Sequence, residues 1–165
     1  MQPKAAREKG WKKVGEVAKL LGTTPRALLY YEEQGIISPR RTSRGTRYYT
    51  KADIRRFAMA HRMVALGIPV KTVRELATIR PAARSGRESS RRLAPAIEEI
   101  IEDLDRRIDE LSRLREDLAR GSEIIRACFD CDLRPTRLTC PECPCETRLY
   151  DAEVLALTWD PDRDE

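Results

Sequence analysis

All five cysteines of the chain lie in one short segment near its C-terminal end. They form Cys128-Phe129-Asp130-Cys131 and, after eight intervening residues, Cys140-Pro141-Glu142-Cys143-Pro144-Cys145. Thiolates are soft ligands that suit zinc, monovalent copper or an iron–sulfur cluster, and two Cys-x-x-Cys pairs favour a four-sulfur site. Thiols this close together in a cytosolic chain favour metal or redox chemistry over a structural disulfide.

The two Cys-x-x-Cys pairs predict one metal centre per subunit, held by Cys128, Cys131, Cys140 and Cys143. Cys145 is then an exchangeable fifth ligand or a reactive thiol. Arg134 and Arg137 lie between the pairs and offset the negative charge of several thiolates. Zinc is our first prediction for the cofactor, and a [2Fe–2S] cluster, another soft metal ion or metal-free thiol switching are the alternatives.

A long helical pattern comes directly before the cysteines. Its apolar residues are spaced alternately four and three apart, and Arg115 and Ser122 continue the alternation where apolar residues are missing. Such a narrow stripe is typical of a coiled coil and needs a partner helix, so we predict a homodimer. We place the helix start near Pro95, because proline lacks a backbone donor. The stripe consists of Ile97, Ile101, Leu104, Ile108, Leu111, Leu118 and Ile125.

The net charge of +5 hides an uneven division along the chain. Residues 1–92 carry 22 Lys and Arg against 7 Asp and Glu, whereas residues 93–165 carry 10 against 20. The first part therefore has a charge of +15 and the second a charge of −10. A basic half favours a polyanionic partner, and nucleic acid is the polyanion that best fits an aliphatic, helical chain.

The basic half begins with two short helices joined by a tight turn. The first is predicted over 14–21 and ends at Gly22; the second is predicted over 25–34 and ends at Gly35. Thr24 is a suitable N-cap for the second helix, and Pro25 is a suitable first helical residue. This arrangement predicts a helix-turn-helix, whose second helix enters the major groove of DNA.

A hairpin, or wing, is predicted after the second helix. Two β segments, 36–41 and 46–49, flank a loop that contains Gly45. Arginines and tyrosines on one ribbon suit contact with phosphates. Those of the predicted wing are Arg40, Arg41, Arg44, Arg47, Tyr48 and Tyr49.

Two further helices and a linker complete the predicted domain order. Thr50 with Asp53 predicts a capped helix to about Leu66, and Pro69 begins another to about Ile79. We predict a DNA-binding domain over 12–80, a linker over 81–94, a dimerisation helix over 95–127, a cysteine-rich loop over 128–146 and a tail over 147–165.

The order of these parts resembles the MerR family of bacterial transcription regulators. The resemblance rests on Val14-Gly15-Glu16-Val17-Ala18, on Leu29-Tyr30-Tyr31-Glu32-Glu33-Gln34-Gly35-Ile36-Ile37 and on Arg44-Gly45-Thr46-Arg47-Tyr48-Tyr49. It continues in Leu66-Gly67-Ile68-Pro69 and in the coiled-coil helix, and covers about residues 12–145.

The resemblance implies a mainly α protein: a winged helix-turn-helix domain, a long antiparallel coiled-coil dimerisation helix and a C-terminal cysteine-rich loop. It implies a non-enzymatic regulator that binds double-stranded promoter DNA together with RNA polymerase. The family usually has arginine where this chain has Leu29, which removes one expected DNA contact. The predicted DNA-binding residues are Thr24, Arg26, Tyr30, Arg40, Arg41, Arg44, Arg47 and Tyr48.

The cysteine segment resembles effector loops of two kinds within the family. Cys131 to Cys140-Pro141 is similar to the mercury and copper sensors, and Cys128-x-x-Cys131 is similar to SoxR-type [2Fe–2S] sensors. Leu133 stands where the SoxR type has a cysteine, and no cysteine starts the long helix as in mercury and zinc sensors. This excludes a site that bridges two subunits through that thiol.

Two other functions were weighed against regulation by a signal. A thiol–disulfide enzyme needs a Cys-x-x-Cys at a strand–helix junction of a βαβ unit, and the sequence predicts no such unit. A DNA-binding protein with a purely structural zinc loop is the other alternative. With no secretory signal and no apolar run of membrane-spanning length, we expect a cytoplasmic protein that does not bind membranes.

Overall fold

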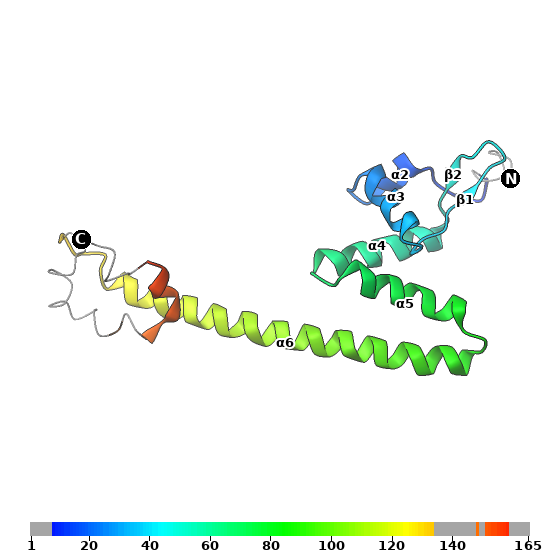
Figure 1. The fold of residues 1–165 in the computed structure, drawn as a ribbon. Helices are drawn as coiled ribbons and strands as arrows, with labels where there is room; N and C mark the ends of the chain where they lie inside the picture. The colour runs from blue at the N-terminus through cyan, green and yellow to red at the C-terminus, as the bar shows by residue number, and fades with distance from the viewer. Residues whose placement is uncertain (1–7, 134–147, 149–150, 159–165) are drawn as a thin grey trace. The chain divides into compact units, whose positions relative to one another are not determined.

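A computed structural model describes residues 8–133, 148 and 151–158 of the chain. Helices dominate these residues, and one two-stranded antiparallel sheet is present among them (Figure 1). The elements are α2 (Val14–Leu20), α3 (Pro25–Glu33), β1 (Arg40–Arg41), β2 (Arg47–Tyr48), α4 (Lys51–Ala65), α5 (Val70–Ala82), α6 (Gly86–Arg126) and the 3-10 helix η2 (Glu153–Leu157).

The predicted boundaries of α2, α3, α4 and α5 agree with the structure to within three residues. Thr24 caps α3 by accepting a hydrogen bond from the Ala27 amide, at 3.2 Å. Thr50 and Asp53 form the predicted capping box of α4. Gly22 and Gly35 follow α2 and α3 with φ of 61° and 71°, a conformation that glycine adopts without strain.

The wing is confirmed but its strands are shorter than predicted. Arg40 pairs with Tyr48 and Arg41 with Arg47, so each strand has two residues. The loop is closed by Thr42, whose hydroxyl accepts a hydrogen bond from the Thr46 amide at 3.1 Å. A backbone bridge between Lys12 and Tyr49 ties the segment before α2 to the far side of the hairpin.

An aromatic and aliphatic core holds α2, α3, α4 and the wing together. Tyr31 lies edge-on to Phe57, with ring centroids 5.1 Å apart, and His61 stacks on Phe57 at 5.4 Å. His61 thus covers the Phe57 ring from the outside and is itself exposed. The largest fully buried side chains are Tyr48, Tyr49, Phe57, Leu28, Ile36, Ile37 and Val17.

The long helix α6 begins at Gly86, so the prediction that it starts near Pro95 is wrong. Ser85 and Glu88 initiate it: the Ser85 hydroxyl accepts from the Glu88 amide at 3.1 Å, and the Glu88 carboxylate accepts from the Arg84 amide at 2.9 Å. Pro95 deprives the helix of one hydrogen bond, which a long and well-capped helix tolerates. The interval 81–94, predicted as a linker, is consequently mostly helical.

The helix α6 has 41 residues and is about 60 Å long. Six of the seven predicted seam residues are exposed in the single chain, from Ile125 at 39 % to Leu111 at 65 %. Such an apolar stripe on a charged helix is typical of a dimerisation coiled coil.

The segment after the cysteines returns to the C-terminal part of α6. It forms the short 3-10 helix η2 within the predicted tail. Ala152 and Leu155 pack against Ile124 of α6 and are at most 4 % exposed. The chain therefore contacts α6 again at residues 152–155, after the cysteines.

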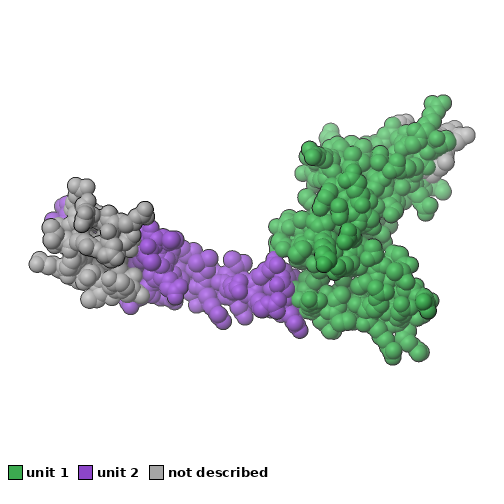
Figure 2. Space-filling view, in the orientation of Figure 1, with its two compact units in different colours: residues 1–100 green, residues 101–165 purple. Residues whose placement is uncertain are grey.

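The chain divides into two compact units, Met1–Ile100 and Ile101–Glu165 (Figure 2). The first holds the helix-turn-helix and the wing, and the second holds most of α6 with η2. None of the helices in the described part of the chain is both long and apolar enough to cross a membrane.

Candidate functional site

The helix α3 presents a mixed face of exposed polar and aromatic side chains. Leu28 and Tyr31 are buried, whereas Arg26 is exposed and Tyr30 is 42 % exposed. Thr24 and the first amides of α3 form a helix N-terminus, which suits contact with a phosphate. The part of the predicted DNA-binding set that lies on α3 is therefore accessible.

The four wing arginines differ in their surroundings. Arg40 and Arg44 are exposed, and within the described part of the chain neither makes an ion pair. Arg41 and Arg47 both pair with Glu32 of α3, with Nη2–Oε1 and Nε–Oε2 distances of 2.6 and 2.7 Å. Two arginines are thus free for an incoming anion, and two are bound to a carboxylate.

One predicted DNA-binding residue is buried, and the position of the family arginine carries no charge. The side chain of Tyr48 is a core residue, with 1 % exposure, so we leave it out of the accessible DNA-binding surface. Leu29, which stands in place of the family arginine, is half-buried and offers no charge.

Only two of the predicted ligands, Cys128 and Cys131, lie within the described residues, and both are free thiols. Cys128 is half-buried and Cys131 is exposed. The Cys131 amide donates to the Cys128 carbonyl at 3.1 Å, so the two residues lie on one tight turn at the end of α6. Such a turn suits chelation of one soft metal ion by both thiolates.

The remaining predicted ligands, Cys140, Cys143 and Cys145, lie outside the described residues. No group of three or more metal-ligating side chains occurs in the described part of the chain. The predicted four-sulfur centre therefore stays a prediction.

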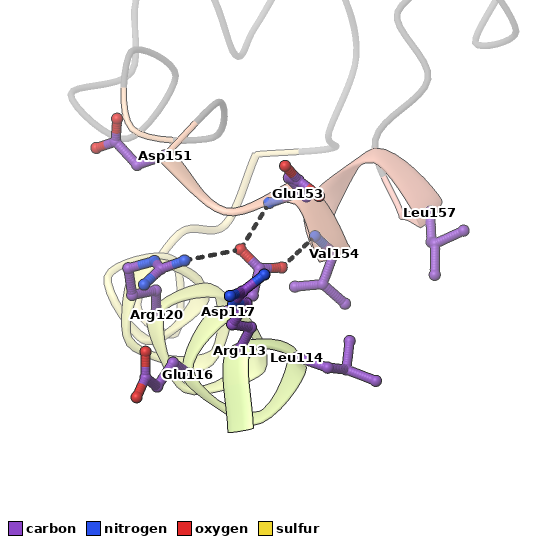
Figure 3. Close-up of a pocket in the computed structure, with 9 residues that line it drawn as sticks. All are labelled: Arg113, Leu114, Glu116, Asp117, Arg120, Asp151, Glu153, Val154 and Leu157. Atoms are coloured by element: carbon purple, nitrogen blue, oxygen red, sulfur yellow. Dashed lines mark hydrogen bonds and ion pairs between the residues drawn. The ribbon is translucent and has the colours of Figure 1, made fainter. Parts of the chain in front are cut away.

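Asp117 fastens the returning segment to α6, as Figure 3 shows. Its carboxylate accepts hydrogen bonds from the Glu153 and Val154 amides at 2.9 and 2.7 Å, and from Arg120 Nη2 at 3.2 Å. These amides are the first of η2 and have no partner within that short helix, so Asp117 serves as its cap. The amide hydrogen bonds, that of Val154 foremost, hold the pKa of the Asp117 carboxyl below its usual value of 3.8.

Gly121, one turn further along α6, gives η2 room to approach. A Cβ at this position would lie 2.6 Å from Val154 Cγ1, well inside van der Waals contact. An open groove of about 730 Å³ lies between α6 and η2, and Leu114, Asp117, Arg120 and Val154 are among its lining residues (Figure 3).

The sequence did not predict the roles of two carboxylates: Glu32, which binds the wing to α3, and Asp117, which binds η2 to α6. Their partners lie 9 to 37 residues away, a range that local patterns do not reach. A signal was present at Gly121, because an isolated glycine inside a helical pattern often marks a close approach of backbone or side chains.

A helix-turn-helix with an arginine-bearing wing, followed by a long helix with an apolar stripe, defines a winged helix-turn-helix DNA-binding regulator. Residues 12–78 match the family model described as MerR HTH family regulatory protein. The chain belongs to the MerR family, and this confirms the interpretation as a regulator rather than an enzyme.

Two regulators illustrate the relationship. The chain is 32 % identical over 111 residues to the HTH-type transcriptional regulator ZntR of Escherichia coli, covering 66 % of this chain and 76 % of that protein. It is 28 % identical over 142 residues to the HTH-type transcriptional regulator HmrR of Rhizobium leguminosarum. That match covers 84 % of this chain and 97 % of HmrR.

Solved structures share the fold. The MerR family regulator HiNmlR, which lacks the sensor domain and is bound to promoter DNA, gives a TM-score of 0.63 at 16 % identity over 72 % of this chain and 92 % of that one. The transcription regulator PbrR691 from Ralstonia metallidurans CH34, in complex with lead(II), gives a TM-score of 0.50 at 21 % sequence identity. The match covers 76 % of this chain and 92 % of that one. MerR regulators bind promoter DNA as dimers.

Proposed function

We propose that the chain is a homodimeric, promoter-binding transcription regulator whose output depends on a soft metal ion held by its C-terminal thiolates. RNA polymerase is the expected partner on the promoter, and the cytoplasm is the expected location. The family membership supports promoter binding, and the related fold of HiNmlR was solved on promoter DNA. The exposed Arg26, Arg40 and Arg44 provide the cationic contacts.

The dimer is proposed from the apolar stripe of α6. Ile101, Ile108 and Leu111 are 50, 59 and 65 % exposed on a helix whose other faces are charged. A partner copy of the same helix buries this stripe at the lowest cost, because each helix offers the other an identical seam.

The metal site is proposed from the thiol chemistry. Cys128 and Cys131 supply one chelating pair, and Cys140 and Cys143 are proposed as the second pair, with Cys145 exchangeable. PbrR691, of related fold, was crystallised with lead(II), which is also a soft ion. Zinc remains our first choice for this chain, and a [2Fe–2S] cluster or another soft metal is the alternative. The bound ion would supply a cross-link between the two thiol pairs.

The observation that carries the regulatory proposal is the attachment of the cysteine segment at both ends. Its first thiols lie directly at the end of α6, and the chain returns to the same helix at Asp117. Binding of one metal ion by both cysteine pairs would therefore change the forces on α6, the proposed dimerisation helix. A local bond of this kind can shift one packed arrangement to another.

The test begins with protein purified without oxygen, measured for metal content and visible absorption. We expect a colourless zinc protein, whereas a brown protein would indicate iron and sulfur. Single Cys→Ser substitutions at all five positions should release the metal at Cys128, Cys131, Cys140 and Cys143 and retain it at Cys145. Equal metal content in Cys128→Ser, Cys140→Ser and wild type would contradict the four-thiolate site.

A purely structural zinc loop is the second candidate, and the attachment at Asp117 also accommodates it. In that case the Cys→Ser variants would lose metal and stability, while transcription from a bound promoter would not change with metal. Measuring promoter output alongside metal content separates the two functions.

A further inference from the structure

We propose that Glu32 is a positioning residue of the DNA interface, which sets the wing against α3 and withholds two wing arginines from the phosphates. This inference rests on the proposed promoter binding, although half of its test needs no DNA. Glu32 lies on the turn of α3 that faces the hairpin, and its side chain is only 15 % exposed.

The geometry is that of one carboxylate shared by both strands of the hairpin. Arg41 reaches it from β1 and Arg47 from β2, each with a hydrogen bond to a different oxygen. Because each strand is only two residues long, the backbone pairing alone is a weak restraint on the hairpin. The shared carboxylate therefore supplies a side-chain restraint on both strands at once.

The charges also divide the wing into two functional classes. Glu32 neutralises one of the two positive charges of its partners, and it occupies the hydrogen-bond donors nearest α3. Arg40 and Arg44 have no such partner among the described residues, so they are the arginines available to a phosphate. Arg41 is 52 % and Arg47 34 % exposed, so a loss of Glu32 would leave both free to reach DNA.

A buried tyrosine lies under this cluster. Burial raises the pKa of the Tyr49 hydroxyl; the negative charge of Glu32 raises it further, and the charges of Arg47 and Arg41 partly oppose this. Its oxygen has no hydrogen-bond partner among the described residues. The Glu32 side chain is itself only 15 % exposed, so its contacts with Arg41 and Arg47 are partly shielded from water.

The chain offers a matched control in Glu33. It is the next residue of α3, it is exposed, and no ion pair involves it in the described part of the structure. Glu32→Gln and Glu33→Gln change the net charge equally and keep the side-chain size. Only the first removes the carboxylate that Arg41 and Arg47 share.

The first measurement is hydrogen exchange of the free protein. The Thr42 and Gly45 amides, which are bonded within the hairpin loop, should exchange faster in Glu32→Gln and unchanged in Glu33→Gln. Arg47→Gln should loosen the same amides, because it removes one half of the shared contact. Equal exchange in the two Gln variants would overturn the proposal.

The second measurement compares two DNA probes: a duplex that the wild-type protein selects from a random library, and a shuffled duplex of the same composition. In Glu32→Gln the preference for the selected duplex should fall about fivefold, the scale of one partly screened ion pair. On the shuffled duplex, the slope of the logarithm of the binding constant against the logarithm of the salt concentration should steepen by up to about 0.9 for each arginine released.

In Glu33→Gln both probes should bind slightly more tightly, with the same preference as wild type. An equal preference in both variants would overturn the proposal. If the wild-type protein selects no sequence, the proposed promoter binding fails, and the exchange measurement still decides whether Glu32 positions the wing.

Discussion

The DNA-binding unit and the C-terminal unit each join a helix to a neighbouring segment through one carboxylate, but the partners differ. Glu32 pairs with the side chains of two wing arginines, Arg41 and Arg47. Asp117 accepts hydrogen bonds from two backbone amides and from Arg120. In our proposal the first contact competes with the phosphates of DNA for two arginines, whereas the second contact caps a short helix.

The two units also differ in what surrounds the carboxylate. The wing and α3 rest on a core with Phe57, Leu28 and Tyr31 at its centre, all at most 3 % exposed. The segment 151–158 rests on a cluster of Ile124, Ala152 and Leu155 with Val154 beside it. A few small apolar contacts give little stability, so the second attachment is the one that a signal can alter at low cost.

The largest effect is expected from substitutions in the apolar stripe of α6, which we propose as the dimer interface. Leu104→Asp with Ile108→Asp should raise the dissociation constant of the dimer more than about a thousandfold, because both changes would bury unpaired carboxylates. Sedimentation would show monomers, while the melting of the DNA-binding unit should be preserved.

The control places aspartates on the opposite face, as Arg106→Asp with Arg113→Asp. These residues are exposed and do not belong to the stripe. A dimer that survives the seam substitutions would show that the stripe is not the dimer interface.

The next effect concerns the attachment of η2. Asp117→Ala should abolish protection of the Glu153 and Val154 amides from hydrogen exchange, because both lose their acceptor. Glu116→Ala, which alters the adjacent exposed residue, should leave them protected. Unchanged hydrogen exchange of these amides in Asp117→Ala would show that Asp117 does not cap η2.

The same contact predicts a pH dependence. Because the folded pKa of Asp117 lies below the usual 3.8, its stabilisation is complete above the usual value and is lost as the pH falls through the lower folded one. The Val154 amide resonance should therefore be constant from neutral pH down to about 5 and shift only in stronger acid. A midpoint above 3.8 would contradict the assigned direction.

A smaller effect is expected in the wing, where it separates free from paired arginines. Arg44→Ala should weaken binding to all duplexes about three- to tenfold and reduce the salt slope by about 0.9, since it removes one phosphate contact. Arg47→Ala should instead loosen the hairpin and change the salt slope less, because Arg47 is bound to Glu32 rather than to a phosphate. Fluorescence anisotropy across salt concentrations distinguishes them, and equal slopes for Arg44→Ala and wild type would exclude a phosphate contact.

The smallest effect is expected at Gly121. Gly121→Ala should stabilise the helix by up to about 1 kcal/mol and yet detach η2, because the new methyl group would collide with Val154. Adding Val154→Ala should partly restore amide protection. Protection that survives Gly121→Ala alone would show that η2 packs differently.

Much of the DNA-binding unit could be predicted from sequence because its determinants are local. Thr24, Thr50, Gly22 and Gly35 mark helix ends by capping or by positive φ. The start of α6 was missed because Pro95 was given more weight than the capping pair Ser85 and Glu88. The one missing hydrogen bond at Pro95 costs less than the cap and the nine further helical residues, 86–94, contribute.

The candidate sites were less predictable because they depend on contacts distant in sequence. The pattern of arginines predicted the wing as a cationic surface, but not that Glu32 engages Arg41 and Arg47. Tyr48 was predicted at the surface because it lies among the wing arginines, whereas in β2 its side chain is buried and that of Arg47 is only partly so. The cysteine spacing predicted the thiol chemistry, and Asp117 lay beyond any local pattern.

The most direct test of the central claim is transcription with purified RNA polymerase from a promoter that the wild-type protein binds. Output is measured with zinc and with a chelator, and DNA occupancy is measured in the same samples. We predict that zinc changes the transcript level at least about tenfold while occupancy changes less than about threefold, and that Cys128→Ser abolishes the response. Transcript levels that do not depend on zinc, in protein shown to bind it, would contradict the claim.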